Sequence, residues 1–298
     1  MPRQLTVPAG GTSREPLSKK VLSYLCQDTE MNKKLGEVAR LANNYVARWL
    51  AKHPAVKEES LTDWLPDFLE QSSPSIRYFE FDRHEETSSS GFDWDWWFLL
   101  ECGCFRARVK AKKLQLSRDY YSELTQANQT DCQIDLLLDS SAAKQFYPLY
   151  MFYAKPDDFE RCRILPTPTA LSICGAQEIH ELAFGSPCHH IECRDICALT
   201  IPLECLFYCP VTHDFPPNGP EQLFRHYFQT PLRSRVGEPE VPGNDRRRGY
   251  EESVPRIIRS LFKMRETDND TERILRDYKS MYEGSRGVVI FDLDDEWE

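Results

Sequence analysis

Residues 91–113 decide the fold, because they define two adjacent strands; they read GFDWDWWFLLECGCFRARVKAKK. Successive side chains of a strand point to opposite faces, so Asp93 and Asp95 share one face of the first run, and Trp94 and Trp96 share the other. The second run is basic on one face and apolar on the other, with Arg106, Arg108, Lys110 and Lys112 opposite Phe105, Ala107, Val109 and Ala111. The short break at 101–103 is typical of a hairpin. The sequence therefore predicts a sheet whose charged face sets an acidic row beside a basic row.

The elements around this hairpin complete an α-β-β-β-α-β order. Apolar residues recur at helical spacing in two segments, and apolar or alternating runs predict four strands. The predicted helices are 58–71 and 131–144, and the predicted strands are 76–82, 92–100, 104–112 and 147–153. This order is more specific than any one of its elements, and it predicts an α/β fold.

Composition and periodicity divide the chain into five segments. Residues 1–16 contain Pro, Gly, Ser and Thr and are predicted to be disordered, and residues 17–56 form a helical extension of two helices. Residues 57–155 form the core. Residues 156–291 form a cysteine-rich and helical part that packs on the core, and residues 292–298 form an acidic, solvated tail.

The composition limits the classes of function. Hydrophobic residues make up 41% and charged residues 28%, as in an ordinary soluble globular protein. No apolar run approaches the roughly 20 residues of a membrane span, and the first residues lack the apolar stretch of a secretory signal. We therefore expect an intracellular protein, cytoplasmic or nuclear, with no membrane partner. The net charge of −10 argues against a general nucleic-acid coat protein, but a local basic groove can act inside an acidic protein.

The charged face of the predicted hairpin has two interpretations. In the first, it is a half-exposed surface whose acidic and basic side chains form cross-strand pairs in water. In the second, two acids and a lysine hold Mg²⁺ against a phosphodiester. Mg²⁺ prefers one or two carboxylates, with phosphate and water completing its shell, and it lowers the pKa of its bound water. A neighbouring lysine can orient that water and stabilise the transition state.

The second interpretation agrees with a resemblance. Residues 91–97 and 108–114 resemble the PD-(D/E)xK nuclease superfamily, near its Mrr-type branch, in which an Asp after a turn is followed by Gln- or Glu-x-Lys on the next strand. They look closer still to a family of uncharacterised function with Gly-Ala-Asp-Trp-Glu-Trp-Trp and Gln-Ala-Lys motifs. Residues 59–63, 133–135 and 147–153 are similar to its other motifs, and the match is strong over about 57–155.

The resemblance implies a restriction-endonuclease-like α-β-β-β-α-β core with a mixed sheet, plus helical additions at both ends. It implies Asp93 as a metal ligand, Lys112 as the catalytic lysine and Glu59 as the helix acid that completes the metal shell. Gln133 would lean towards the site, and Asp95 would be a more peripheral ligand. The implied cofactor is Mg²⁺, with Mn²⁺ as a substitute. The implied activity is DNA cleavage, with defence against foreign DNA as one role. Many relatives of this class work as dimers to cut both strands, so a homodimer is one assembly that the resemblance implies.

Lys110 departs from the family pattern, which has Gln or Glu at that position. A cation cannot coordinate Mg²⁺ and repels it, more strongly where the site is buried. Either another oxygen fills the coordination position, or the activity is lost. If the fold tolerates Lys110, we expect its ammonium to reach solvent or an acid such as Asp95. Pairing with Asp95 would leave Asp93 free for metal.

Other features have competing interpretations. The stretch from Cys188 to Cys209 contains zinc-type residues, but the spacing fits buried free thiols better, and we expect all 11 cysteines to be reduced. Trp97 shares the face of the two acids and is a candidate substrate contact. Arg106, Arg108 and Lys113, or residues 246–248, would give a positive stripe past the site. If cleavage is absent, the alternatives are an inactive nuclease-like protein that binds nucleic acid or a protein partner, and a scaffold.

Overall fold

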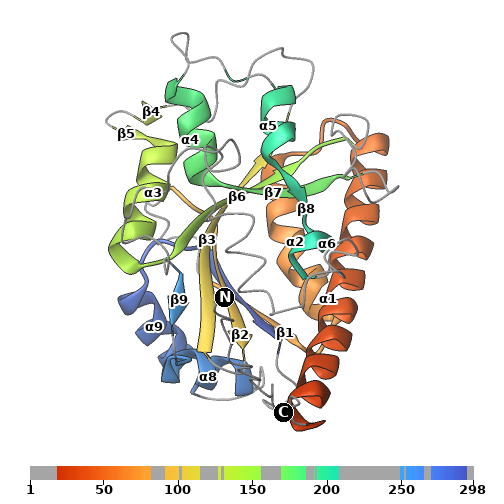
Figure 1. Cartoon of the computed structure of the whole chain (residues 1–298). Helices are drawn as coiled ribbons and strands as arrows, with labels where there is room; N and C mark the ends of the chain where they lie inside the picture. Colours follow the sequence, from red (N-terminus) through yellow and green to blue (C-terminus); the bar gives the residue numbers. More distant parts are fainter. Residues whose placement is uncertain are drawn as a thin grey trace, which may run out of the picture.

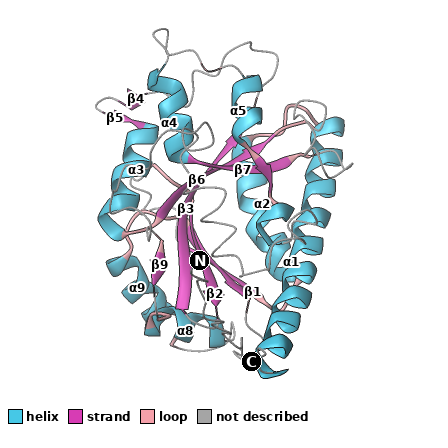
Figure 2. Cartoon of the chain, viewed as in Figure 1, coloured by secondary structure: helices cyan, strands magenta, loops and turns pink. Residues whose placement is uncertain are grey.

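A computed structural model describes residues 19–81, 91–100, 103–114, 127–128, 131–155, 169–185, 191, 193–207, 249–251, 253–264 and 270–293. Within these residues, eight strands form one open mixed sheet with helices on both faces (Figure 1). Colouring by secondary structure shows the sheet as a twisted layer between the two groups of helices (Figure 2). The fold is therefore mixed α/β.

The sheet joins strands from both halves of the chain. Its order is β1-β10-β2-β3-β6-β7-β8, and β9 pairs with β3. The β10–β2 and β3–β6 pairs are parallel, and the others are antiparallel. The strands are β1 Ile76–Glu80, β2 Trp94–Leu100, β3 Gly103–Lys113, β6 Tyr147–Tyr153, β7 Leu171–Gly175, β8 Ile201–Pro202, β9 Tyr250–Glu251 and β10 Gly287–Asp292. A separate ribbon pairs β4 Ala127–Asn128 with β5 Asp131–Cys132.

One face of the sheet is apolar and packs against α1 Lys19–Lys52, α2 Glu58–Ser72 and α6 Glu204–Phe207. The tryptophans Trp94 and Trp96 lie on this face, as the alternation of β2 requires, and both are buried. Burying a large apolar side chain contributes about 1.5–3 kcal/mol, so this face supplies the main core of the described residues.

The opposite face carries two smaller apolar clusters. One lies under α3 Gln133–Lys144, α4 Ala176–Gly185 and α5 Cys193–Leu199. The other lies under α8 Arg256–Lys263 and α9 Thr271–Met281. The charged side chains of β2 and β3 project from this same face, because they alternate with the residues of the first core.

The predicted α-β-β-β-α-β order is present between α2 and β6, with the short β4–β5 ribbon added before α3. Two features differ from the prediction. The expected pair of N-terminal helices is one helix in the structure, α1, and β10 inserts between β1 and β2. Residues 1–16 and most of the acidic tail lie outside the described residues. None of the described helices combines the length and the apolar character that crossing a membrane requires.

Candidate functional site

The predicted charged face exists, and its six side chains are buried. They form what we call the charged row: Asp93, Asp95, Arg106, Arg108, Lys110 and Lys112. Asp95 lies opposite Arg108 in the β2–β3 register. A buried charge is costly unless it is paired and hydrogen-bonded, so a half-exposed hairpin facing water does not describe this surface. The partners of each charge determine what the row can do.

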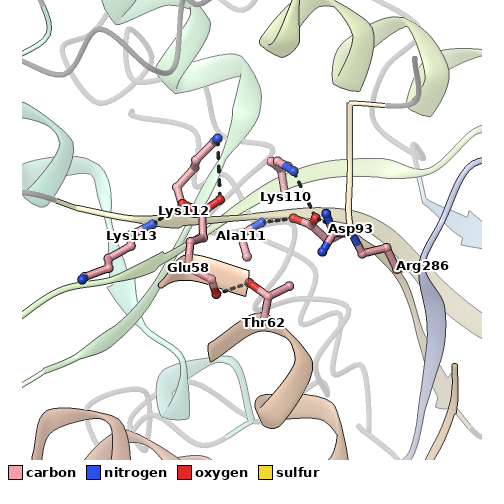
Figure 3. Close-up of polar contacts among 8 residues, drawn as sticks. All are labelled: Glu58, Thr62, Asp93, Lys110, Ala111, Lys112, Lys113 and Arg286. Atoms are coloured by element: carbon pink, nitrogen blue, oxygen red, sulfur yellow. Dashed lines mark hydrogen bonds and ion pairs between the residues drawn. The ribbon is translucent and has the colours of Figure 1, made fainter. Parts of the chain in front are cut away.

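The end of β3 extends past β2, and this leaves backbone N–H groups on its open edge. β2 begins opposite Val109, so the amides of Ala111 and Lys113 have no strand partner on that side. Oδ2 of Asp93 accepts a hydrogen bond from Ala111 N–H, and Oε2 of Glu58 accepts one from Lys113 N–H, each at 2.8 Å (Figure 3). Buried amides require such partners, so both carboxylates are held in place by the strand edge.

Asp93 is also bound by two cationic side chains. Nζ of Lys110 donates to its Oδ1 at 3.0 Å, and Nε of Arg286 lies 3.4 Å from the same oxygen (Figure 3). Lys110 therefore reaches an acid, but that acid is Asp93, so the expected pairing with Asp95 that would leave Asp93 free is wrong. The reason is register, because Asp95 lies directly opposite another cation of β3, Arg108, whereas Lys110 lies nearer the start of β2.

Lys112 pairs with an acid from the opposite helical layer. Nζ of Lys112 lies 3.7 Å from Oε1 of Glu58, the first residue of α2, whose carboxylate reaches the end of β3 (Figure 3). Burial raises the pKa of Glu58, and the positive charge of Lys112 partly offsets that rise. The predicted helix acid, Glu59, is exposed at the next position. The acid that the structure brings to the site is thus Glu58.

Glu58, Asp93, Lys110 and Lys112 form one unit, which we call the carboxylate–lysine cluster. With both carboxylates ionised and Arg286 included, three positive charges face two negative ones. Lys110 and Arg286 already bind Oδ1 of Asp93, so in this arrangement that oxygen does not fit a role as a ligand of Mg²⁺. Within the described part of the chain, no group of three or more His, Cys, Asp or Glu side chains is placed to hold a metal ion.

Asp95 belongs to a separate, structural network. Nε of Arg108 donates to it at 3.3 Å, and the Tyr278 hydroxyl donates to it at 2.8 Å. Burial raises the pKa of Asp95 to about 6, against the lowering effect of Arg108. Trp97 is fully buried, and its indole N–H donates to Tyr278 at 2.9 Å, so it is a core residue and not a substrate contact.

Gly91 positions the start of β2 beside α3. Its φ is +74°, and a Cβ there would lie 2.8 Å from Leu136 Cβ and 3.1 Å from the Gln133 carbonyl oxygen. Only glycine tolerates this conformation and this close approach without strain. Gln133 therefore begins α3 near the turn before Asp93, but among the described residues its side chain makes no hydrogen bond to the cluster.

The structure adds residues that sequence reasoning missed. Arg286 comes from the turn before β10, and its backbone N–H also donates to the Asp93 carbonyl at 2.7 Å. Tyr150 of β6 is the register partner of Lys110, and its buried hydroxyl has no hydrogen-bond partner in the described structure. Nothing in the local sequence marks Arg286. The alternation of β6 does place Tyr150 on the charged face.

The predicted positive stripe is not formed by the β3 arginines. Arg106 pairs with Glu251 at 2.5 Å, Arg108 pairs with Asp95, and both guanidinium groups are buried. The ammonium group of Lys113 donates hydrogen bonds to the carbonyl oxygens of residues 54 and 56, at 2.6 Å each. Residues 246–248 lie outside the described residues.

Five cysteines whose side chains are described form no disulfide bond: Cys104, Cys132, Cys174, Cys197 and Cys205. Burial raises the pKa of Cys104 to about 12 and raises that of Cys174 well above its usual value, so neither is a reactive thiolate. In the stretch considered for zinc, Cys197 and Cys205 are buried thiols. Cys188 and Cys209 lie outside the described residues.

No curated protein and no solved structure matches this chain. A family model matches residues 32–296, which extend from α1 to the acidic tail and include both Asp93 and Arg286. The match therefore spans the whole described sheet, with the C-terminal strand that completes its centre. On this match, the chain belongs to the family of unknown function DUF6615.

Proposed function

We propose that this protein is a restriction-endonuclease-like protein that binds the phosphodiester backbone of nucleic acid, DNA foremost, and that its native sequence does not cleave it with Mg²⁺. The single observation that carries the proposal is the contact of 3.0 Å between Lys110 and Asp93. The ammonium group of Lys110 binds the carboxylate that the resemblance assigns to a metal ion. The proposal is thus a nuclease-like site that has become a binding site.

The balance of charge supports an anionic ligand. A unit charge about 4 Å from a divalent cation contributes about 8 kcal/mol at an effective dielectric constant of about 20. Lys110 and Arg286 lie against Asp93 and Lys112 lies beside Glu58, so their positive charges weaken the attraction of these carboxylates for Mg²⁺. A phosphate diester has the opposite preference, because lysine and arginine donate charge-assisted hydrogen bonds to its oxygens.

A second candidate function is Mg²⁺-dependent phosphodiester hydrolysis. It is favoured by the convergence of a helix acid, a strand acid and a lysine, Glu58, Asp93 and Lys112, on one unit. This is the set of residue types that the resemblance implies, with Glu58 in place of Glu59. Hydrolysis would require Lys110 to leave Asp93, which is the point on which the two candidates differ.

The experiment uses the full chain with labelled duplex DNA and plasmid, in Mg²⁺, in Mn²⁺ and in a chelator. We expect salt-sensitive binding that the chelator does not change, and intact plasmid throughout. Lys112→Ala should weaken binding several-fold, whereas Lys34→Ala, an exposed lysine of α1, should not. Plasmid cleavage by the native protein that Asp93→Ala abolishes would replace the first candidate by the second.

A further inference from the structure

The solvent side of α1 and α2 carries a group of apolar side chains, which we call the aromatic patch. Leu41 is 54% exposed and Tyr45 is 41% exposed, and three more rings beside them are partly exposed. The structure describes every side chain from residue 31 to residue 72, including the turn that joins the two helices. A contiguous exposed apolar surface marks a site of interaction. The patch consists of Leu41, Tyr45 and Trp49 of α1 and Trp64 and Phe68 of α2.

The rings of the aromatic patch hold one another in place. Tyr45 stacks on Trp64, with the ring centroids 4.4 Å apart and the planes at 16°. The Phe68 ring lies 4.7 Å from Trp64, and Trp49 packs edge-on against Trp64 at 5.9 Å. Leu41 precedes Tyr45 by one helical turn, so it extends the same stripe along α1. Tyrosine and tryptophan side chains held in this way are the type that dominates the affinity of protein interfaces.

Opposite charges flank the aromatic patch on its two sides. From residue 31 on, α1 exposes four basic side chains and one acid, whereas α2 contains acids and neither Lys nor Arg. The exposed basic residues are Lys34, Arg40, Arg48 and Lys52, and the exposed acids of α2 are Glu59 and Asp67.

Arg48 and Asp67 lie directly beside the patch. Arg48 follows Leu41 by two helical turns, and Asp67 follows Trp64 by three residues, so each shares the exposed side of its helix. Arg48 Nε donates to the Asn44 carbonyl oxygen at 3.2 Å, and Asp67 accepts from the Gln71 amide at 2.9 Å. Both partners are neutral groups, so each side chain keeps its charge.

We infer that the aromatic patch is a homodimer interface, and that its occupant is the same patch of a second copy of this chain. The helices α1 and α2 pack side by side at the edge of the molecule (Figure 1). A two-fold axis that runs parallel to them, between the two copies, places α1 of one copy over α2 of the other. The aromatic patches then face each other. Because every contact of a two-fold interface occurs twice, Arg48 approaches Asp67 of the partner subunit on both sides of the patch.

Other occupants match the surface less well than a second copy does. A single-stranded nucleic acid stacks its bases on aromatic rings, but it also needs a positively charged groove along its backbone, and the α2 flank is acidic. A peptide of one sign of charge would match one flank and be repelled by the other. A second copy supplies both signs in the required order. The inference does not depend on the proposed function, because the charged row lies on the opposite face of the sheet.

The test measures the mass of the full chain by sedimentation equilibrium, at protein concentrations from about 1 to about 100 µM. Leu41→Glu places a charge at the most exposed position of the aromatic patch. Its matched control is Met281→Glu, which places the same charge at an apolar residue of α9 that is 49% exposed and lies on the other face of the sheet. Circular dichroism reports folding, which neither change should disturb because both side chains face solvent.

We expect the native chain to dimerise with a micromolar dissociation constant. The patch is two helices wide and about 22 Å long over α2, at about 1.5 Å for each residue, which is small for a specific interface. Leu41→Glu should weaken dimerisation by about tenfold or more, because the charge enters the interface twice. Met281→Glu should change it by less than about twofold. A native chain that is monomeric throughout overturns the inference, as does an equal effect of the two variants.

A charge swap tests the two-fold arrangement itself. Arg48→Glu and Asp67→Arg each set like charges against each other across the interface, so each should weaken the dimer several-fold. The double variant Arg48→Glu with Asp67→Arg restores opposite charges and should dimerise within about twofold of the native chain. Two weakened single variants without recovery in the double variant overturn the arrangement. Oligothymidylate that quenches tryptophan fluorescence in a monomeric native chain, but not in Leu41→Glu, would assign the aromatic patch to unpaired bases and also overturn the inference.

Discussion

The ammonium group of Lys110 lies 3.0 Å from Oδ1 of Asp93, on the buried side of the open end of β3. In the pattern that the chain resembles, this position of β3 carries Gln or Glu, and the carboxylate of the preceding strand is free for metal. Here one side chain supplies the charge that a metal would supply. The fold around Asp93 can therefore be complete without any ion, and the first prediction removes that lysine.

Lys110→Gln should expose a latent metal site. The change leaves Asp93 with Arg286 and the Ala111 amide, and it removes a unit charge that repels a divalent cation. We expect Mg²⁺ or Mn²⁺ to raise the melting temperature of the variant but not that of the native protein. Because a buried partner is lost, the free energy of unfolding without metal should fall by roughly 1–3 kcal/mol.

The control is the double variant Lys110→Gln with Asp93→Ala, which should show no stabilisation by metal. Plasmid cleavage is measured on the same proteins, and any cleavage gained by Lys110→Gln should vanish in the double variant. A native protein that binds Mg²⁺ as well as Lys110→Gln does would show that Lys110 leaves Asp93 readily, contrary to the proposed function.

The second prediction decides which helix acid belongs to the site. Glu58→Gln removes the partner of Lys112 and one negative charge from the cluster, so DNA affinity should rise several-fold at low salt. Glu59→Gln makes the same change of charge at an exposed neighbour and should alter affinity by less than twofold. Anisotropy at two salt concentrations measures both. Equal effects would mean that only net charge is sensed, and a larger effect at Glu59 would restore the original assignment.

Much of the fold could be predicted, because the relevant signals are local. The alternation in β2 and β3 fixed their faces and their antiparallel pairing, and the apolar run of β6 gave the bounds that the structure has. The position of β10 within the sheet could not be predicted, because nothing in a six-residue apolar strand indicates which strands it pairs with. For the same reason, the strands of residues 156–291, a segment expected to be cysteine-rich and helical, were not expected to join the sheet of the core.

The site residues were predicted correctly only where the alternation of side chains along a strand decides which face they lie on. Asp93 and Lys112 follow from alternation, and both lie in the cluster. Glu58 and Glu59 are adjacent at a helix start, where periodicity does not distinguish them. Arg286 is distant in the sequence and reaches Asp93 only because β10 pairs with β2. The partner of Lys110 depended on the β2–β3 register, which the sequence left open.

The third prediction concerns pH and Asp95. Burial raises its pKa from 3.8 to about 6, so between about pH 4 and about pH 6 the native state holds a proton that the unfolded state has lost. Stability from this group therefore falls as pH rises through that window. Asp95→Asn does not titrate, so its stability relative to the native protein should improve by on the order of 2 kcal/mol from about pH 4 to about pH 7.5.

Urea unfolding at both pH values measures this difference. The difference between the two pH values is used because an amide also differs from a protonated carboxyl in its hydrogen bonds, which shifts stability by an amount that does not depend on pH. Asp277→Asn, an exposed acid of α9, should show no such pH dependence. A native protein that gains stability relative to Asp95→Asn as pH rises would show that Arg108 outweighs burial at this carboxylate.

The last prediction uses two buried tyrosines with opposite hydrogen bonding. The Tyr150 hydroxyl beside the cluster has no partner in the described structure, whereas the Tyr278 hydroxyl accepts from Trp97 and donates to Asp95. An unpaired buried hydroxyl costs about 1–3 kcal/mol, and removing it cleanly is neutral or stabilising. Tyr150→Phe should therefore leave the free energy of unfolding unchanged or raise it by about 1 kcal/mol. Tyr278→Phe should lower the free energy of unfolding by roughly 2–4 kcal/mol, because it leaves the buried Trp97 indole N–H and the Asp95 carboxylate without these hydrogen bonds. Equal losses would show that Tyr150 bonds to ordered water beside Asp93.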